Sequence, residues 1–361
     1  MIQHLIFLLL FLLSLPILRD FETKKVFPTY FFSFIGLFLF AALRYGYGND
    51  YFSYYNYFSL SKIDAISDIE IGYVFLSKIF PNYFLLVAFL SFVQILSLFL
   101  IFKSFVNVKY YWLSLAYTVI NIDIFLIGLS AQRQMLAISM IVLSIIVKIK
   151  FKNSFLSLLL ISLAPLFHIS SVFVIPIFYF ISSEKWIKKY IKLQTIILIL
   201  ILLFLISTFF EEASINLFQS SFEQISNFLS PSSKYLKNYI INEYRKNPFT
   251  VFLTYGTIAI ISCYFLKFVD PRFRFFGNLY IIGNIFYILS IIHFQFSRIG
   301  FYFIPFGIVY VYAIATSKTS KIIKISLLLL IFIIYAVKYY NFFNAPLWEP
   351  FHEYKTIFSV I

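Results

Sequence analysis

The stretches that decide the fold class are TIILILILLFLISTFF at Thr195–Phe210 and ISLLLLIFIIYAV at Ile325–Val337. Neither stretch contains a charged residue, and both approach the ~20 residues that a helix needs to cross a bilayer. Of the 361 residues in the chain, 61% are hydrophobic and 12% are charged. The charged fraction is about half of the roughly 25% usual for a soluble domain. The sequence therefore predicts an all-α, polytopic integral membrane protein.

Apolar runs separated by polar breaks predict about twelve transmembrane helices in a single membrane domain, residues 1–361. The expected spans are roughly 2–18, 27–43, 84–102, 110–127, 133–147, 152–167, 169–183, 190–209, 249–266, 274–292, 299–316 and 322–340. The first run has no basic region before it and no small-residue cleavage site before Arg19. We therefore expect a retained helix there rather than a cleaved signal peptide.

The basic residues set the predicted orientation. Six short breaks hold 18 of the 29 Lys and Arg residues: Arg19–Lys25, Lys103–Lys109, Lys148–Lys152, Lys185–Lys192, Lys267–Arg274 and Lys318–Lys324. Positive charge favours cytoplasmic loops, so these breaks are expected inside. Their scatter between apolar runs also argues against a nucleic-acid-binding face, despite a formal net charge of +14. Two long loops, at 44–83 and 210–248, and the C-terminal tail at 341–361 are then expected outside.

Residues Lys152–Ser183 allow two interpretations: one long helix, or two short helices joined outside at Ala164–Ser170. A single helix would place the basic break at Lys185–Lys192 outside, against the positive-inside rule. It would also carry Pro165, which lacks an N–H, near its middle. The sequence favours two short helices.

The unusual polar residues outside the cytoplasmic breaks fall at outer helix ends, where ionisable groups are functional candidates because they are costly near hydrocarbon. The first group is LRYGYGNDY at Leu43–Tyr51, followed in the same loop by EIGY at Glu70–Tyr73. Its glycines permit tight turns, and its tyrosines, carboxylates and amides suit a sugar. An aromatic interface belt capped by a snorkelling Arg44 fits this segment equally well.

Three further groups share that predicted face: SAQRQ at Ser130–Gln134, FHISS at Phe167–Ser171 and FSRIGFYF at Phe296–Phe303. Arg133 could grip a phosphate bidentately or snorkel to lipid headgroups. His168 suits proton transfer near neutrality, although a lone histidine is more often structural. With Arg44 and Arg298, Arg133 makes three arginines, which could offset most of the charge of a lipid-linked diphosphate.

Other chemistries lack their sequence signals. There is no P-loop, no Gly-rich dinucleotide turn, no nucleophile elbow and no Cys/His metal spacing, so no metal or cofactor is expected. Asp123 and His293 lie near helix ends with no partner recognisable from sequence. Cys263 is the single cysteine, so there is no disulfide framework.

Taken in order, the motifs resemble the EpsG-like family of bacterial exopolysaccharide and O-antigen polymerases over about residues 40 to 305. The motifs that carry the resemblance are Arg-x-Gly-x-Gly-x-Asp-Tyr from Arg44, Glu-x-Gly-Tyr from Glu70, Gln-Arg-Gln from Gln132, Phe-His-x-Ser-Ser from Phe167 and Arg-x-x-x-Tyr-Phe from Arg298.

The resemblance implies a Wzy-type reaction at the periplasmic face of a bacterial inner membrane. A growing glycan would move from undecaprenyl diphosphate to the next lipid-linked oligosaccharide repeat unit. The partners implied are those lipid-linked units, membrane lipid and a chain-length regulator protein, with no nucleic acid. On this interpretation Arg133 and Arg298 hold the diphosphate, and His168 is the candidate base or orienting residue. The substrate-binding candidates are Arg44, Tyr47, Asn49, Asp50, Tyr51, Glu70, Gln134, Ser170 and Tyr302.

Three rival functions stay open at this stage. A flippase for lipid-linked units would favour cationic residues at mid-membrane depth rather than at outer helix ends. An O-antigen ligase would share the donor and the arginines. A membrane acyltransferase could use His168 as a base, but it would leave the three arginines less well explained.

Overall fold

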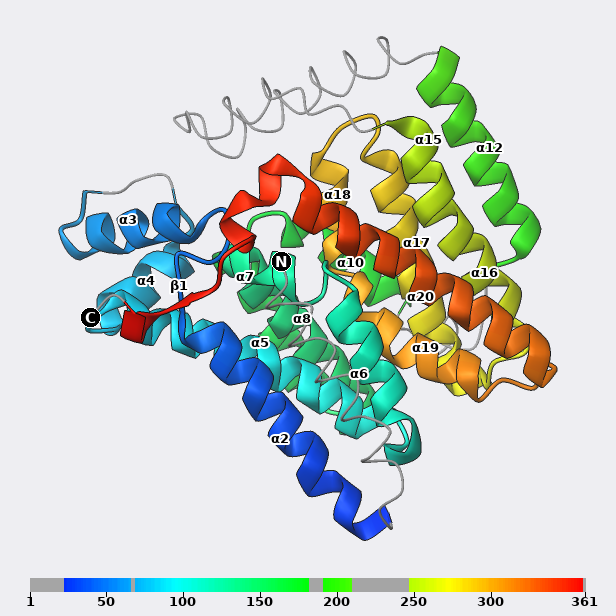
Figure 1. Cartoon of the computed structure of the whole chain (residues 1–361), viewed down its shortest axis with the longest axis horizontal. Helices are drawn as coiled ribbons and strands as arrows, with labels where there is room; N and C mark the ends of the chain where they lie inside the picture. The colour runs from blue at the N-terminus through cyan, green and yellow to red at the C-terminus, as the bar shows by residue number, and fades with distance from the viewer. Residues whose placement is uncertain (1–22, 66–68, 182–190, 210–246, 360–361) are drawn as a thin grey trace. The chain divides into compact units, whose positions relative to one another are not determined.

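The computed structural model is all-α, and it describes residues 23–65, 69–181, 191–209 and 247–359 (Figure 1). The span expected at 2–18, residues 210–246 of the second outward loop and most of the basic break at Lys185–Lys192 lie outside the described residues. The chain divides into two compact units, Met1–Ile175 with Ile308–Ile361 (unit 1) and Pro176–Gly307 (unit 2), which are described in turn.

Unit 1 contains most of the predicted site motifs. Its helices and strands are α2 (Thr23–Ala42), β1 (Arg44–Tyr45), α3 (Tyr51–Lys62), α4 (Ile71–Ile79), α5 (Tyr83–Phe105), η1 (Val108–Tyr110), α6 (Tyr111–Ile120), α7 (Leu126–Ser130), α8 (Gln132–Lys150), α9 (Ser154–Leu163), η2 (Ala164–Leu166), α20 (Lys321–Asn344), η6 (Pro346–Phe351), β2 (Lys355–Thr356) and η7 (Ile357–Ser359). Two helices, α10 (Ser171–Ile181) and α19 (Gly307–Ala315), cross the boundary between the units.

Helices α2 and α5 pack side by side and run in opposite directions (Figure 1). Phe34, in the middle of α2, has its ring centroid 5.2 Å from that of Phe102 near the end of α5. Arg44, just after α2, donates a 3.0 Å hydrogen bond to Ser91, in the first half of α5. The end of α2 and the start of α5 therefore lie at the same end of unit 1.

Helices α5 and α8 run in the same direction, because Gln132 at the start of α8 bonds to Tyr83 at the start of α5. The Ser97 and Ser139 hydroxyls meet further along the two helices. The basic side chains Lys103, Lys148 and Lys150 come at the other ends of these helices. Unit 1 thus has its own predicted site motifs at one end and predicted cytoplasmic charge at the other.

The helix break favoured by the sequence is present. Helix α9 ends at Leu163, a 3-10 turn covers Ala164–Leu166, and α10 begins at Ser171. The Asn153 side chain caps the start of α9 by accepting a hydrogen bond from the Leu156 N–H. His168 is therefore carried on a turn between two short helices, as predicted.

The C-terminal tail returns to the site end of unit 1. Strand β2 pairs antiparallel with β1, so that Arg44 faces Thr356 and Tyr45 faces Lys355. The Tyr354 hydroxyl donates to the Phe40 carbonyl oxygen at 2.8 Å, and the two rings stack. The described residues of the segments predicted to lie outside, 44–83 and 341–361, thus contain short helices and a two-stranded ladder.

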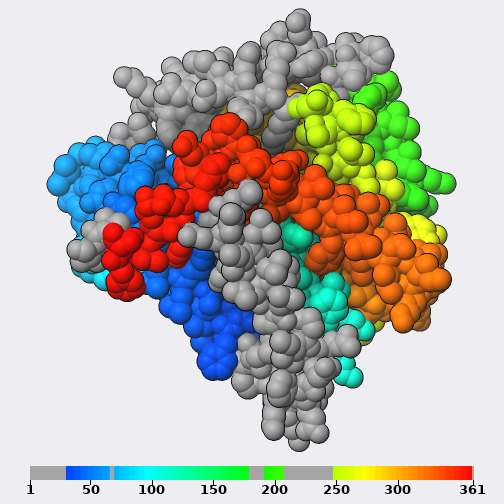
Figure 2. All heavy atoms as spheres, viewed as in Figure 1, coloured from blue at the N-terminus to red at the C-terminus, as the bar shows by residue number. Residues whose placement is uncertain are grey.

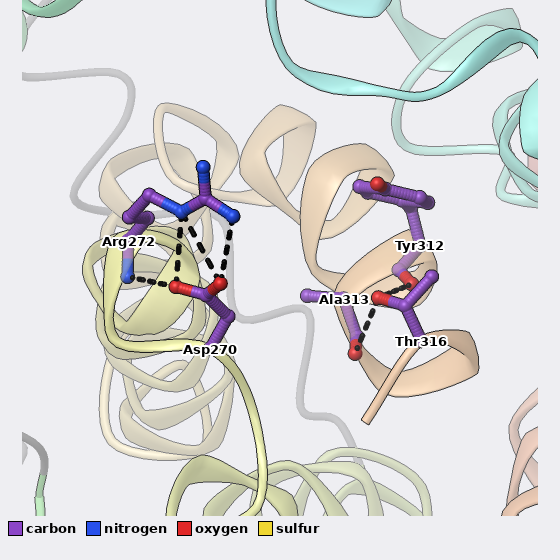
Figure 3. Close-up of polar contacts among 5 residues, drawn as sticks. All are labelled: Asp270, Arg272, Tyr312, Ala313 and Thr316. Atoms are coloured by element: carbon purple, nitrogen blue, oxygen red, sulfur yellow. Dashed lines mark hydrogen bonds and ion pairs between the residues drawn. The ribbon is translucent and has the colours of Figure 1, made fainter. Parts of the chain in front are cut away.

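Unit 2 contains α12 (Leu193–Phe209), α15 (Pro248–Val251), η3 (Phe252–Gly256), α16 (Thr257–Leu266), η4 (Pro271–Phe273), α17 (Arg274–Leu289), α18 (Gln295–Phe301) and η5 (Ile304–Phe306). Tyr255 and Tyr287 stack at 4.4 Å between ring centroids. Asp270 caps η4 through the Arg272 N–H and also pairs with the Arg272 guanidinium (Figure 3).

Five helices among the described residues are long and apolar enough to span a membrane: Tyr83–Phe105, Gln132–Lys150, Pro248–Leu266, Gln295–Ala315 and Lys321–Asn344. Helix α20 runs along the face shown in Figure 2, and only 11% of its apolar window is buried in the protein. Such an exposed apolar helix suits contact with lipid. The chain is a membrane protein, and the total of about twelve spans stays a prediction.

Candidate active site

Arg44 anchors the first motif from inside the protein. Its side chain is 2% exposed, and its guanidinium donates to the Ala41 carbonyl oxygen, to Ser91 and to the Leu129 carbonyl oxygen. Burial lowers the pKa of Arg44 from its ordinary value. The residue therefore ties the start of the 44–83 loop to α5 and to α7, which is a positioning role.

The backbone of the first motif, Leu43–Tyr51, turns so that it lies against the second motif, Ser130–Gln134. Gly46 and Gly48 have φ values of 65° and 114°, which favour glycine. A Cβ on Gly48 would lie 3.4 Å from the Ser130 Cα. The Asp50 N–H donates to the Ser130 hydroxyl at 3.0 Å, while the Asp50 side chain is exposed. The sugar-binding candidate Asp50 thus stands at the surface directly beside the Ser130–Gln134 motif.

Tyr83 links the same two motifs by hydrogen bonds. Its hydroxyl donates to the Tyr51 carbonyl oxygen at 3.0 Å and accepts from the Gln132 side chain at 3.0 Å. Tyr51 itself is 1% exposed, and burial raises its pKa to about 12, against the opposing effect of Arg44. Tyr51 therefore acts as a core residue of the loop.

Arg133 is paired with Glu70, which joins the second motif to the Glu-x-Gly-Tyr motif. One guanidinium nitrogen contacts a Glu70 carboxylate oxygen. The Arg133 guanidinium also lies 5.5 Å from the centre of the Tyr54 ring and 5.8 Å from that of Tyr57. Both rings come from α3 and hold the cation by cation–π attraction. Arg133 thus contacts three side chains of the 44–83 loop.

The Phe-His-x-Ser-Ser motif packs onto the Glu-x-Gly-Tyr motif at Gly72. A Cβ on Gly72 would lie 2.6 Å from the Leu166 carbonyl oxygen and 2.7 Å from the Phe167 ring. Only glycine allows this approach of α4 to the turn that carries His168. His168 is 8% exposed, and its Nδ1 lies 2.6 Å from the Ser170 hydroxyl. That contact orients the imidazole ring.

The pKa of the Tyr54 hydroxyl is affected by Arg133 and by nearby carboxylates. Burial raises its pKa, Arg133 opposes that change, and the carboxylates Asp50 and Glu70 raise it further. This end of unit 1 therefore brings the Arg133 guanidinium and the Glu70 carboxylate together beside tyrosine rings.

Two sugar-binding candidates face the C-terminal tail instead. Tyr47 is fully buried, and its ring centroid lies 4.9 Å from that of Phe351 and 5.2 Å from that of Tyr354. The Asn49 side chain donates to the Leu347 carbonyl oxygen at 2.9 Å. Both residues hold the tail against the loop. Gln134, a further candidate, is 4% exposed in the first turn of α8.

Arg298 and Tyr302 belong to unit 2. The Arg298 guanidinium lies 5.9 Å from the centre of the Phe294 ring, and Tyr302 is fully buried. The grouping of Arg298 with Arg133 stays a prediction. His293 lies just before α18, where its Nδ1 accepts a hydrogen bond from the Gln295 N–H at 3.3 Å.

Sequence reasoning missed the aromatic partners of Arg133 and the partner of Asp123. Tyr54 and Tyr57 are three residues apart, a spacing that places two rings on one face of a helix. This spacing could have indicated the pair of rings from the sequence. Asp123 is 3% exposed and pairs with Lys338 of α20, which no local pattern indicates.

The cluster can bind an anion and exchange a proton. Arg133 offers a bidentate fork for a phosphate, Glu70 and Asp50 can accept hydroxyl hydrogens, and His168 can carry a proton. Within the described residues, no group of three or more His, Cys, Asp or Glu side chains is arranged to hold a metal ion.

One comparison with known proteins identifies a family. The EpsG family model matches residues 27–356, nearly the whole chain. No curated protein and no solved structure matches. The matched range contains every motif that suggested the family from sequence. The chain belongs to the EpsG family.

Proposed function

We propose that this protein is a polysaccharide polymerase that transfers a growing glycan from undecaprenyl diphosphate to the next lipid-linked repeat unit. The observation that carries the proposal is the convergence of four family motifs of unit 1 near the partly buried Arg133–Glu70 pair. Family membership supports the same conclusion. The reaction takes place at the periplasmic face of the bacterial inner membrane.

The chemistry is a glycosyl transfer. An acceptor sugar hydroxyl oxygen bonds to the anomeric carbon of the growing chain, and the bond from that carbon to the phosphate oxygen breaks. The electron pair leaves with undecaprenyl diphosphate, and the hydroxyl proton passes to a base. The diphosphate is already an activated leaving group, so the reaction needs cations on the phosphates and a base for the hydroxyl.

The proposed roles start from the family motifs, and the contacts support those in unit 1. Arg133 binds the diphosphate, while Arg44 and Asp50 organise the sugar-facing loop. The bonds from Arg44 to the Ala41 and Leu129 carbonyl oxygens support that organising role. His168, oriented by Ser170, is the base or holds the acceptor. The acceptor sugar lies beside the exposed Asp50.

A transporter of lipid-linked units is the strongest rival. It is less well supported, because Arg133 lies at the start of α8 rather than at its middle. A ligase would share the donor and differ only in its acceptor.

Chain extension by the purified protein tests the proposal. The full chain is placed in lipid vesicles with undecaprenyl-diphosphate-linked repeat units extracted from the native host lacking this gene. A polymerase lengthens the glycan and releases one undecaprenyl diphosphate for each bond formed. Units that never lengthen, with an active preparation of a known polymerase as control, would contradict the proposal.

A further inference from the structure

We infer that Glu70 is the catalytic base and that its carboxylate stays paired with Arg133 until the donor binds. The donor diphosphate displaces the Glu70 carboxylate from the Arg133 guanidinium, and the released carboxylate takes the proton of the acceptor hydroxyl. This inference rests on the proposed polymerase function and adds a coupling between donor binding and base release.

The first support is that the guanidinium expected to bind diphosphate is already occupied by an anion. Arg133 contacts the Glu70 carboxylate, and their side chains are 6% and 17% exposed. A buried arginine without a counter-charge is strongly destabilising. The Glu70 carboxylate therefore supplies the negative charge in the resting protein, and a diphosphate can replace it because it carries more charge.

The second support is that Arg133 does not depend on Glu70 for its position. The Tyr54 and Tyr57 rings lie against the guanidinium, and Arg133 Nε lies 3.5 Å from the Tyr54 hydroxyl. Both tyrosines belong to α3, whereas Glu70 precedes α4. The guanidinium can stay in place when the carboxylate leaves it.

The third support is that the Glu70 side chain is not tied to its own helix. Glu70 is the N-cap residue of α4, yet its carboxylate makes no capping hydrogen bond. Of the two partners it is also the more exposed. Loss of the Arg133 contact therefore frees the carboxylate to turn toward an acceptor hydroxyl.

The step balances without a further reactant. The acceptor hydroxyl oxygen bonds to the anomeric carbon, and the hydroxyl proton moves to a Glu70 carboxylate oxygen. The bond from the anomeric carbon to the phosphate oxygen breaks, and both of its electrons leave with the diphosphate. Release of undecaprenyl diphosphate and loss of the proton restore the Arg133–Glu70 pair. His168 then has the orienting role, which its contact with Ser170 suits.

The experiment compares wild type with Glu70→Gln in lipid vesicles, by binding of undecaprenyl diphosphate and by chain extension. The neutral side chain competes less for Arg133, so we expect several-fold tighter binding. Without its base, the variant extends chains more slowly by about 10²- to 10⁴-fold. A residue with only a structural role would weaken binding and turnover together.

Asp64→Asn is the matched control, because it makes the same charge change in the same loop. Asp64 pairs with Lys78 at the surface, where its side chain is 77% exposed. We expect its binding and extension to equal those of wild type.

If Glu70→Gln binds undecaprenyl diphosphate as wild type does, or more weakly, the donor does not displace Glu70 from Arg133. If the variant extends chains at the wild-type rate, Glu70 is not the catalytic base. A wild-type chain that binds undecaprenyl diphosphate but never extends units would contradict the proposed function and the base assignment together. The binding comparison would still decide the displacement, since it needs no turnover.

Discussion

Gly72 lies against Leu166, so close that a Cβ on the glycine would stand 2.6 Å from the Leu166 carbonyl oxygen. This approach joins the helix that follows Glu70 to the turn that carries His168. The Glu-x-Gly-Tyr and Phe-His-x-Ser-Ser motifs are almost a hundred residues apart in the sequence. They pack together because glycine at position 72 has no side chain. The glycine of Glu-x-Gly-Tyr has a packing role, whereas the glutamate pairs with Arg133.

Gly72→Ala should disturb this contact and reduce polymer synthesis. Backbone must move to admit the methyl group, and overpacking of this kind costs about 1–3 kcal/mol. Gly36→Ala is the control: no atom lies within 4 Å of its added Cβ, and alanine favours the helix. Thermal unfolding in detergent and polymer gels measure both effects. Equal behaviour of the two variants would contradict the packing role.

Arg133→Ala and His168→Ala should each shorten or abolish the polymer while the protein is still made. Loss of one preorganised group that stabilises charge typically costs about 10²- to 10³-fold in rate. Arg272→Ala serves as control, since that arginine is 80% exposed and pairs with Asp270 at the surface (Figure 3). Polymer of normal length and amount from both site variants would refute the site.

Asp123→Asn should destabilise unit 1, because it removes the buried carboxylate that pairs with Lys338, whose side chain is 18% exposed. Breaking a buried pair costs roughly 3–5 kcal/mol. The exposed pair Lys355–Glu353 is the comparison, where Glu353→Gln should cost only about 0–1 kcal/mol. A double-mutant cycle with Lys338→Met measures the coupling by thermal unfolding. A coupling no larger than that of the exposed pair would show that Asp123 is not held by Lys338.

Stability should fall as the pH drops from 6.5 to 4. Burial lowers the pKa of His293 from 6.5 to about 4, so in this window the unfolded chain binds a proton that the folded chain does not. The loss is up to roughly 3 kcal/mol. His293→Asn keeps an acceptor for the Gln295 N–H and should flatten this part of the profile. A variant whose profile matches wild type would exclude His293 as the source.

Two features could be predicted from the sequence: the break between α9 and α10, and the position of several site motifs at the same end of unit 1. Pro165 and the basic break after it predicted two short helices, and the loop charges placed Arg44, Arg133 and His168 together. Local signals of this kind are readable because they act within one helix or one loop. Arg298 lies in unit 2, and its approach to these residues stays a prediction.

The pairings across the chain could not be predicted. Glu70 and Arg133 are 63 positions apart, and Asp123 and Lys338 are 215 positions apart, so neither pair leaves a local pattern. Tyr47 and Asn49 resembled sugar-binding residues in sequence, yet they contact the returning C-terminal tail. Tertiary packing decided which tyrosines and amides of the loop became buried.

The most direct test of the polymerase assignment is a gel of surface polysaccharide from the native host, with this gene deleted and then complemented. The account predicts that the ladder collapses to lipid core carrying one repeat unit, because a single unit is still exported and ligated, and that complementation restores the ladder. Loss of every repeat unit, including the single one, would indicate a flippase or a ligase and would contradict the account.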